Sequence, residues 1–146
     1  MTITSHTSAS APLTQAQRAD YAALLLRVTM GVLFLAHAGM KYFVFTPAGT
    51  AGFFESLGLP GPLAYLTIAA EVLGGIALLV GAYTRWVSLA LVPVIIGAGY
   101  FAHASSGFFF SNEGGGWEFL LFWTVALLVQ ALLGDGAYSL TNRKAR

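Results

Sequence analysis

The sequence predicts an all-α membrane protein, a four-transmembrane-helix bundle with both termini on the cytoplasmic side. Of its 146 residues, 57% are hydrophobic and 9% are charged, and the mean hydropathy is +0.74. Soluble domains carry about 25% charged residues, so this surface has too few charges to face water. Four apolar segments, each near the ~20 residues that cross a bilayer, have no broad polar face. These observations favour a lipid-embedded bundle over four buried helices of a soluble protein.

Each apolar segment begins or ends at a residue that caps or breaks a helix. Pro47 follows the first segment, Gly81 closes the second, and Pro93 lies inside the third, where proline removes a backbone donor. Thr14 and Gln17 have the spacing of a capping box, which indicates a helix start at the membrane surface. The spans are therefore expected at about 21–45, 62–82, 85–103 and 117–133, in a membrane domain (14–140) between a disordered leader (1–13) and a basic tail (141–146).

The distribution of basic residues predicts the orientation of the bundle. With four spans, the two termini and the loop between the second and third spans lie on one side of the membrane. Short loops rich in Lys and Arg stay cytoplasmic, so the two longer loops face outward. We expect the chain in the bacterial inner (plasma) membrane as a multi-pass protein. The basic residues on the cytoplasmic side are Arg18, Arg85, Arg143, Lys144 and Arg146.

Composition excludes several classes of partner and cofactor. The formal net charge of +1 argues against nucleic acid as a partner, and the lipid bilayer is the expected one. The chain has no cysteine, which excludes disulfide exchange, thiolate metal sites and iron–sulfur clusters within it. No metal site is expected. The glycines open no strand–turn–helix unit, so the chain has no flavin or nicotinamide fingerprint.

Ionisable residues inside the apolar segments are the candidate functional groups, because such residues are costly in a membrane and mark functional sites. His37 and Lys41 lie four residues apart in LFLAHAGMKYF, near the outer end of the first span. His103 and Glu118 fall at a similar outer level, and Glu71 falls near the midplane beneath them. We expect these five to form a catalytic site in the outer half of the bundle.

Helical spacing predicts that this cluster faces the bundle interior. At about 100° per residue, Lys41 shares a face with Arg27, and His37 lies at its edge. Glu71 shares a face with the Gly74–Gly75 pair, whose small residues allow close helix packing. Because a carboxylate at this depth needs a cation, we expect a structural ion pair between Arg27 and Glu71, with Lys41 and a protonated His37 as alternative partners.

Several of these residues also have purely structural interpretations. Lys41 would extend to the outer headgroups, and His103 would be an interfacial histidine. Arg85 would anchor the cytoplasmic side, and Gln130 would make a hydrogen bond between helices.

Four stretches together resemble the DoxX family of small bacterial membrane proteins: RVTMGVLFLAHAGMKYF, EVLGGIALLVGAYTRW, GFFFSNEGGGWEF and LLGDGAYSL. The resemblance covers roughly Tyr21 to Leu140. This chain departs from the family pattern at Ala38, where the family usually has glycine, and at Thr141, where the family often has aspartate. The positions carried over from the family are Arg27, His37, Lys41, Glu71, Gly74, Gly75, Arg85, Gly107, Gly115 and Glu118.

The resemblance implies membrane redox chemistry, because DoxX proteins resemble the small membrane subunit of thiosulfate:quinone oxidoreductase. A quinone would enter the bundle from lipid and would need hydrogen-bond donors such as His37, Lys41 and His103, with Glu71 or Glu118 relaying protons. Electrons would come from a partner redox subunit or a soluble donor. The aromatic residues that could line the ring site are Phe34, Tyr42, Phe43, Phe101 and Phe108.

Two other functions are open at this point. Small-residue stripes such as Ala70 with Gly74–Gly75, and the outward loop SSGFFFSNEGGGWEF, would suit a non-enzymatic subunit or assembly factor of a redox or stress complex, or a homo-oligomer. Alternatively, His37 and His103 on two helices would ligate a b-type haem.

Overall fold

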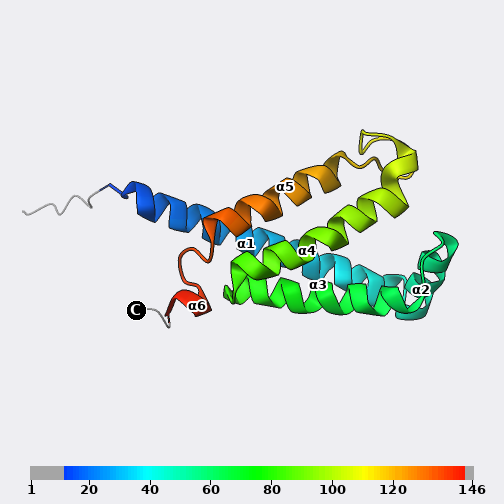
Figure 1. The fold of residues 1–146 in the computed structure, drawn as a ribbon, viewed down its shortest axis with the longest axis horizontal. Coiled ribbons are helices and arrows are strands. Elements are labelled where there is room, and N and C mark those ends of the chain that lie inside the picture. The colour runs from blue at the N-terminus through cyan, green and yellow to red at the C-terminus, as the bar shows by residue number, and fades with distance from the viewer. Residues whose placement is uncertain (1–11, 144–146) are drawn as a thin grey trace, which may run out of the picture.

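The computed structural model describes residues 12–143, and all regular structure in that range is helical, which confirms the all-α class. The four long helices run back and forth between two ends of the molecule (Figure 1): α1 (Gln15–Gly39), α3 (Pro62–Val80), α4 (Thr84–Ala98) and α5 (Glu118–Leu133). The shorter elements are α2 (Pro47–Ser56), α6 (Leu140–Arg143), the π-helical turns η1 (Met40–Val44) and η2 (Gly99–His103), and the 3-10 turn η3 (Ala104–Ser106). We call the end that carries α2 the outer end and the end that carries α6 the inner end.

Within the described residues, three helical stretches are long and apolar enough to cross a membrane: Gln15–Val44, Pro62–Val80 and Thr84–Ser106. Helix α5 is apolar but has only 16 residues. The expected helix signals are present, since Thr14 and Gln17 form a capping box and Gly81 ends α3 in a left-handed conformation with φ 69°. The expected leader (1–13) and basic tail (141–146) lie largely outside the described residues.

Helix α2 and the two π-helical turns were not expected from the sequence. The Thr46 side chain accepts a hydrogen bond from the Gly49 N–H at 3.1 Å, and Pro47 occupies the first turn of α2. Pro47 therefore follows the first span and also begins a new helix, because its fixed φ suits the first turn of a helix. The turns η1 and η2 contain Lys41 and His103, respectively, and π-helical turns occur often at functional sites.

A contact between two glycines sets the register of α1 against α3. A Cβ atom on Gly31 would lie 2.8 Å from the Gly75 carbonyl oxygen, and one on Gly75 would lie 3.1 Å from the Gly31 carbonyl oxygen. The adjacent Gly74 faces α4, where a Cβ would lie 2.8 Å from the Leu91 side chain. The Gly74–Gly75 pair thus lets two neighbouring helices approach α3 closely.

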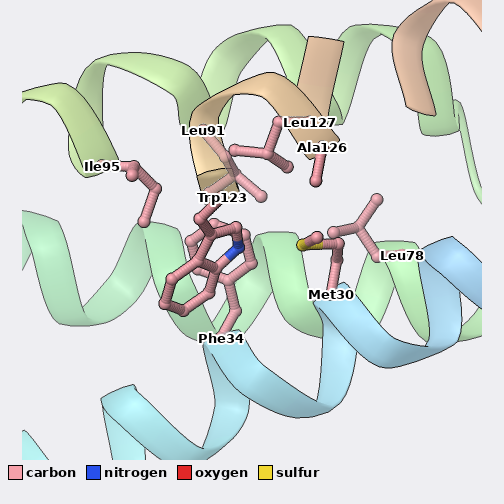
Figure 2. Close-up of a cluster of buried hydrophobic side chains, with 8 residues drawn as sticks. All are labelled: Met30, Phe34, Leu78, Leu91, Ile95, Trp123, Ala126 and Leu127. Carbon is pink, nitrogen blue, oxygen red and sulfur yellow. The ribbon is translucent and has the colours of Figure 1, made fainter. Parts of the chain in front are cut away.

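All four long helices contribute side chains to one apolar core (Figure 2). The rings of Phe34 and Trp123 pack with their centroids 4.9 Å apart, and both residues are almost fully buried. This core lies between the two ends of the bundle and separates the polar groups at one end from those at the other. Its buried members are Met30, Phe34, Leu78, Leu91, Ile95, Trp123, Ala126 and Leu127.

Arg27 holds the inner end of the bundle together. One guanidinium nitrogen donates to the carbonyl oxygens of Leu78 (2.9 Å) and Leu79 (2.7 Å), and the other donates to that of Ala137 (2.9 Å). Leu78 and Leu79 lie in the last turn of α3, where the helix dipole favours a cation. The Leu78 carbonyl also accepts from the Gly81 N–H at 3.2 Å, so Arg27 adds a second donor there. Arg27 is 1% exposed, and its two terminal nitrogens make these bonds away from water, whereas its Nε has no partner among the described residues. The three bonds join α1, α3 and the segment after α5.

The segment after α5 also caps the start of α4. The Thr84 N–H donates to the Asp135 carboxylate at 2.9 Å, and the Tyr83 N–H donates to the Thr141 hydroxyl at 2.8 Å. Thr141 therefore supplies a hydrogen-bond acceptor at the position where the DoxX pattern often has aspartate.

We expect Gly75→Val to lower the free energy of unfolding by about 1–3 kcal/mol, because the new methyl groups would push α1 away from α3. Thermal unfolding in detergent would measure this loss. Gly97→Ala is the matched control, since a Cβ at Gly97 in α4 would meet nothing within 4 Å. Equal melting temperatures for the two variants would contradict the close glycine contact.

We expect Arg27→Met to destabilise the fold by more than about 2 kcal/mol, because it removes three hydrogen bonds that join α1, α3 and the segment after α5. Arg27→Lys should recover only part of the loss, since an ammonium group cannot reproduce the planar fork of donors. Thermal unfolding of both variants, with the exposed Arg18→Met as control, would test this. A stable Arg27→Met protein would show that these three bonds are dispensable.

Candidate functional site

A cavity of about 1010 Å³ lies at the outer end, between the α1–α3 pair and the α4–α5 pair. The two pairs diverge towards this end, and α2 lies beside the ends of α1 and α3 (Figure 1). Most of the wall is aliphatic or aromatic. Four of the five expected catalytic residues line it, namely His37, Lys41, Glu71 and His103.

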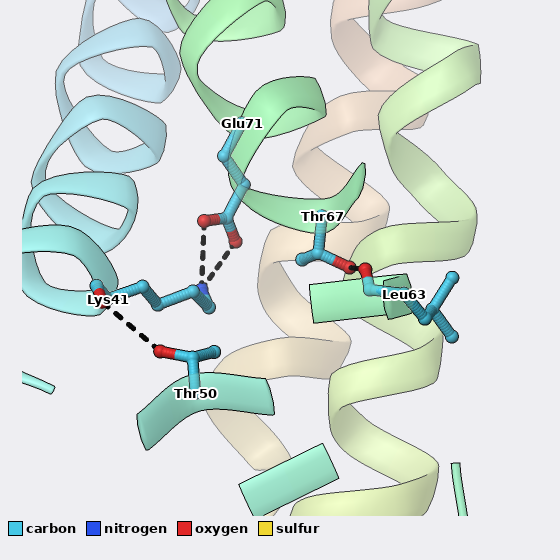
Figure 3. A network of polar contacts seen from close by, with 5 residues as sticks. All are labelled: Lys41, Thr50, Leu63, Thr67 and Glu71. Atoms are coloured by element: carbon cyan, nitrogen blue, oxygen red, sulfur yellow. Dashed lines mark hydrogen bonds and ion pairs between the residues drawn. The ribbon is translucent and has the colours of Figure 1, made fainter. Parts of the chain in front are cut away.

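Lys41 and Glu71 form an ion pair in the wall of the cavity (Figure 3). The Lys41 Nζ donates to both carboxylate oxygens of Glu71, at 2.7 and 2.8 Å. The side chain of Glu71 is 4% exposed and that of Lys41 is 19% exposed. The pair is therefore largely shielded from bulk solvent, and each charge depends on the other.

The direction of helical side chains explains why Lys41 is the partner. With Gly31 opposite Gly75 in antiparallel helices, Lys41 lies roughly 9 Å nearer the outer end than Glu71. Helical side chains lean towards the N-terminus of their own helix, so Lys41 leans inward and Glu71 leans outward. The two side chains therefore converge.

The expected ion pair between Arg27 and Glu71 does not form. In the same register Arg27 is level with Leu79, roughly 12 Å from the level of Glu71. Because Arg27 leans towards the inner end and Glu71 towards the outer end, their side chains point apart. Gln130 also differs from expectation, since its Nε2 donates to the Gly134 carbonyl at 2.8 Å within the same chain segment instead of to another helix.

His37 stands beside the ion pair with its ring nitrogens available to a ligand. Its ring packs edge-on against Trp123, with centroids 5.0 Å apart, and both residues line the cavity. No side chain or backbone group of residues 12–141 makes a hydrogen bond to the His37 imidazole. His37 can therefore donate to, or accept from, a molecule in the cavity.

His103 lies on the α4 side of the cavity and has a defined tautomer. Its Nδ1 lies 2.7 Å from the Gly115 carbonyl oxygen. A carbonyl only accepts, so we assign the proton to Nδ1, which leaves Nε2 of the neutral ring as an acceptor. A neutral His103 can take a proton or ligate a metal ion, but donates through Nε2 only when it is protonated.

Thr50 joins α2 to the site. Its hydroxyl donates to the carbonyl oxygens of Lys41 (3.1 Å) and Thr46 (2.9 Å). Thr50 is 4% exposed and lines the cavity, as do Phe53 and Phe54 of the same helix. These three residues were not expected at the site, although Thr46 and Pro47 indicate a helix start that brings them here.

The remaining expected residues lie elsewhere. Glu118 does not line the cavity, because its Oε1 accepts a hydrogen bond from the Phe110 N–H at 2.8 Å in a separate groove, which Phe108 also lines. Of the other aromatic candidates only Phe101 lines the cavity, since Phe34 belongs to the core. Tyr42 and Phe43 lie on the surface of the bundle, where they are 54% and 82% exposed.

Comparisons with known proteins identify the family of the chain. The DoxX family model matches residues 22–104. "Putative oxidoreductase CatD" of Bacillus subtilis is 40% identical over 75 residues, which cover 51% of this chain and 54% of CatD, so the match spans about half of each protein. "Inner membrane protein YqjF" of Escherichia coli is 33% identical over 133 residues, 86% of this chain and 95% of that protein.

A third relative, an uncharacterized protein of Haemophilus influenzae, is 27% identical over 124 residues, 84% of this chain and 90% of that protein. No solved structure matches the chain closely enough to count as a relative. With the three candidate spans, the family match and the YqjF relative confirm the expected inner-membrane location. The chain is a membrane protein that belongs to the DoxX family.

Proposed function

We propose that the chain crosses the inner membrane four times, with both termini in the cytoplasm. The alternating course of α1, α3, α4 and α5 supports this arrangement (Figure 1). Helix α5 has 16 residues and is about 24 Å long, somewhat less than the ~30 Å hydrocarbon core. The aromatic residue Trp117 at its outer end suits the bilayer interface, which makes up the difference.

We further propose that the chain is a redox component whose outer cavity binds a quinone. The observation that carries this proposal is a mainly apolar cavity whose polar lining includes a Lys–Glu pair and two histidines. Its volume of about 1010 Å³ is at the upper end of the ~300–1,000 Å³ typical of small-molecule sites. Phe45, Phe53 and Leu66 in its wall are 53%, 51% and 65% exposed, so a lipid-soluble molecule can reach the cavity sideways.

The polar residues of the cavity can supply a quinone headgroup with hydrogen-bond donors and protons. A quinone carries two carbonyl acceptors, and its reduction takes up two electrons and two protons. His37 can donate a hydrogen bond to one carbonyl, and Lys41 can donate to the same molecule because its ammonium has three protons and Glu71 uses two. Glu71 and His103 can then hold or pass protons.

Electrons must reach such a site from another protein. The chain has no cysteine and no nucleotide fingerprint, so a partner redox subunit or a soluble donor would supply them. The name of the relative CatD supports an oxidoreductase role. A non-enzymatic subunit of a redox complex is the second candidate, favoured by the same lack of an internal electron carrier.

We expect gently purified protein to carry a quinone in its organic extract and to bind added ubiquinone or menaquinone. His37→Ala and Lys41→Met should each weaken quinone binding about tenfold, because each removes a donor to the headgroup. Binding can be followed by the quenching of tryptophan fluorescence, since Trp123 lines the cavity. Arg85→Met, far from the cavity, is the control.

Two results would contradict the quinone proposal. Protein that never binds quinone would favour the non-enzymatic subunit, and the search would move to its partner. A Soret band in the absorption spectrum would instead assign His37 and His103 to a b-type haem.

A double-mutant cycle would show how far Lys41 and Glu71 depend on each other. We expect Lys41→Met and Glu71→Leu singly to cost about 3–5 kcal/mol of stability, because each leaves a buried charge unpaired. The double variant should regain most of that loss, since it removes both charges. Thermal unfolding of all four proteins gives the coupling energy. Additive losses would show that the pair is not coupled.

A further inference from the structure

We propose that a second groove at the outer end binds the ammonium headgroup of a membrane lipid. The groove has a volume of about 630 Å³ and is lined by Phe108, Phe110, Glu118, Phe119 and Phe122. Phenyl faces carry negative charge density and attract organic cations, and a carboxylate attracts them further. The inference rests on the proposed four-span arrangement but not on quinone binding.

The loop and the start of α5 are fixed to each other, so the groove is built before any ligand arrives. The Glu118 Oε1 accepts from the Phe110 N–H at 2.8 Å, and the Glu118 N–H donates to the Phe108 carbonyl at 2.9 Å. Phe108 and Phe110 therefore both stand beside Glu118. No donor among the described residues bonds to the Glu118 Oε2, which leaves that oxygen for a ligand.

Helix α5 supplies the other wall. Glu118 and Phe122 are four residues apart and Phe119 and Phe122 are three apart, so Phe122 is a neighbour of both on the helix surface. The rings of Phe110 and Phe119 lie with their centroids 6.4 Å apart across the groove. The carboxylate thus has phenyl rings on both the loop side and the helix side.

The charge of Glu118 has no protein partner in the described part of the chain. The ion pair found there joins Lys41 to Glu71, and both Glu71 oxygens bond to Lys41. Among residues 12–141, Arg18, Arg27 and Arg85 lie on the inner half of the bundle, and the His103 Nδ1 donates to Gly115. The described residues therefore offer no cation to Glu118, which leaves its charge available to a cationic ligand.

The surroundings favour a lipid ammonium over a metal ion. No three His, Asp or Glu side chains gather as metal ligands within the described residues, and phenyl rings cannot replace the oxygen ligands of Mg²⁺ or Ca²⁺. Phe110 and Phe122 are 64% and 67% exposed, so the groove is reachable from lipid. It lies at the outer end of α5, the level at which headgroups are expected, and acyl chains can follow the apolar surface of that helix.

Native mass spectrometry of the purified full chain would test this site. We would titrate it with phosphatidylethanolamine and with phosphatidylglycerol of the same acyl chains. We expect phosphatidylethanolamine to bind about fivefold more tightly, the factor that a cation–π contact of ordinary strength gives. Glu118→Gln should remove this preference, because it removes the charge while its amide oxygen can still accept from Phe110.

Two further variants separate the groove from general charge effects. Glu113→Gln removes an exposed carboxylate of the same loop that does not line the groove, so it should keep the preference. Phe122→Leu keeps the apolar surface and removes one ring, so it should reduce the preference. The proposal is overturned if the wild-type protein does not distinguish the two lipids, if Glu118→Gln keeps the preference, or if Glu113→Gln loses it equally. Because lipid binding is read directly, the outcome is independent of whether the cavity binds quinone.

Discussion

The contact between Gly31 and Gly75 is the constraint on which the rest of the structure depends. A Cβ atom on either glycine would lie less than 3.2 Å from the carbonyl oxygen of the other. This close contact sets the register of α1 against α3. That register puts Lys41 within reach of Glu71 and Arg27 within reach of the last carbonyls of α3. A shift of one turn, about 5.4 Å, would unpair a carboxylate and a guanidinium that are both buried.

The bundle divides its polar groups between two ends. At the inner end Arg27, Asp135 and Thr141 are bonded to backbone groups, so they complete helix ends and leave little to offer a ligand. At the outer end Lys41 and Glu71 bond to each other in the wall of a large cavity. The apolar core lies between the two sets (Figure 2). Any proton or ligand exchange by the outer groups therefore has its shortest route through the cavity and not through the inner end.

Sequence reasoning predicted the apolar helices, their caps and the inward faces of α1 and α3 because these depend on spacing within one helix. It failed where the outcome depends on the relative positions of two helices. Arg27 and Lys41 share a face, and only the glycine contact and the lean of the side chains decide that Glu71 meets Lys41. Glu118 lies at the expected level along the bundle. Its depth does not determine where its side chain points, because the hydrogen bond from the Phe110 N–H sets that direction. Thr46 and Pro47 indicate the start of α2, whereas the spacing of apolar residues does not predict the π-helical turns η1 and η2.

The position of the Lys41–Glu71 pair bears on whether it is only structural. A pair retained for register alone would be most useful where helices touch, and at that place the chain has Gly31 and Gly75 instead. Replacing a buried pair by apolar residues is often neutral or stabilising, so stability by itself gives little reason to keep one. Here the pair lines a cavity beside His37, whose imidazole has no hydrogen-bond partner among the described residues. The pair joins η1 to α3 and also lines a cavity, where a ligand can compete for its charges, which is consistent with the proposed role in binding or proton transfer.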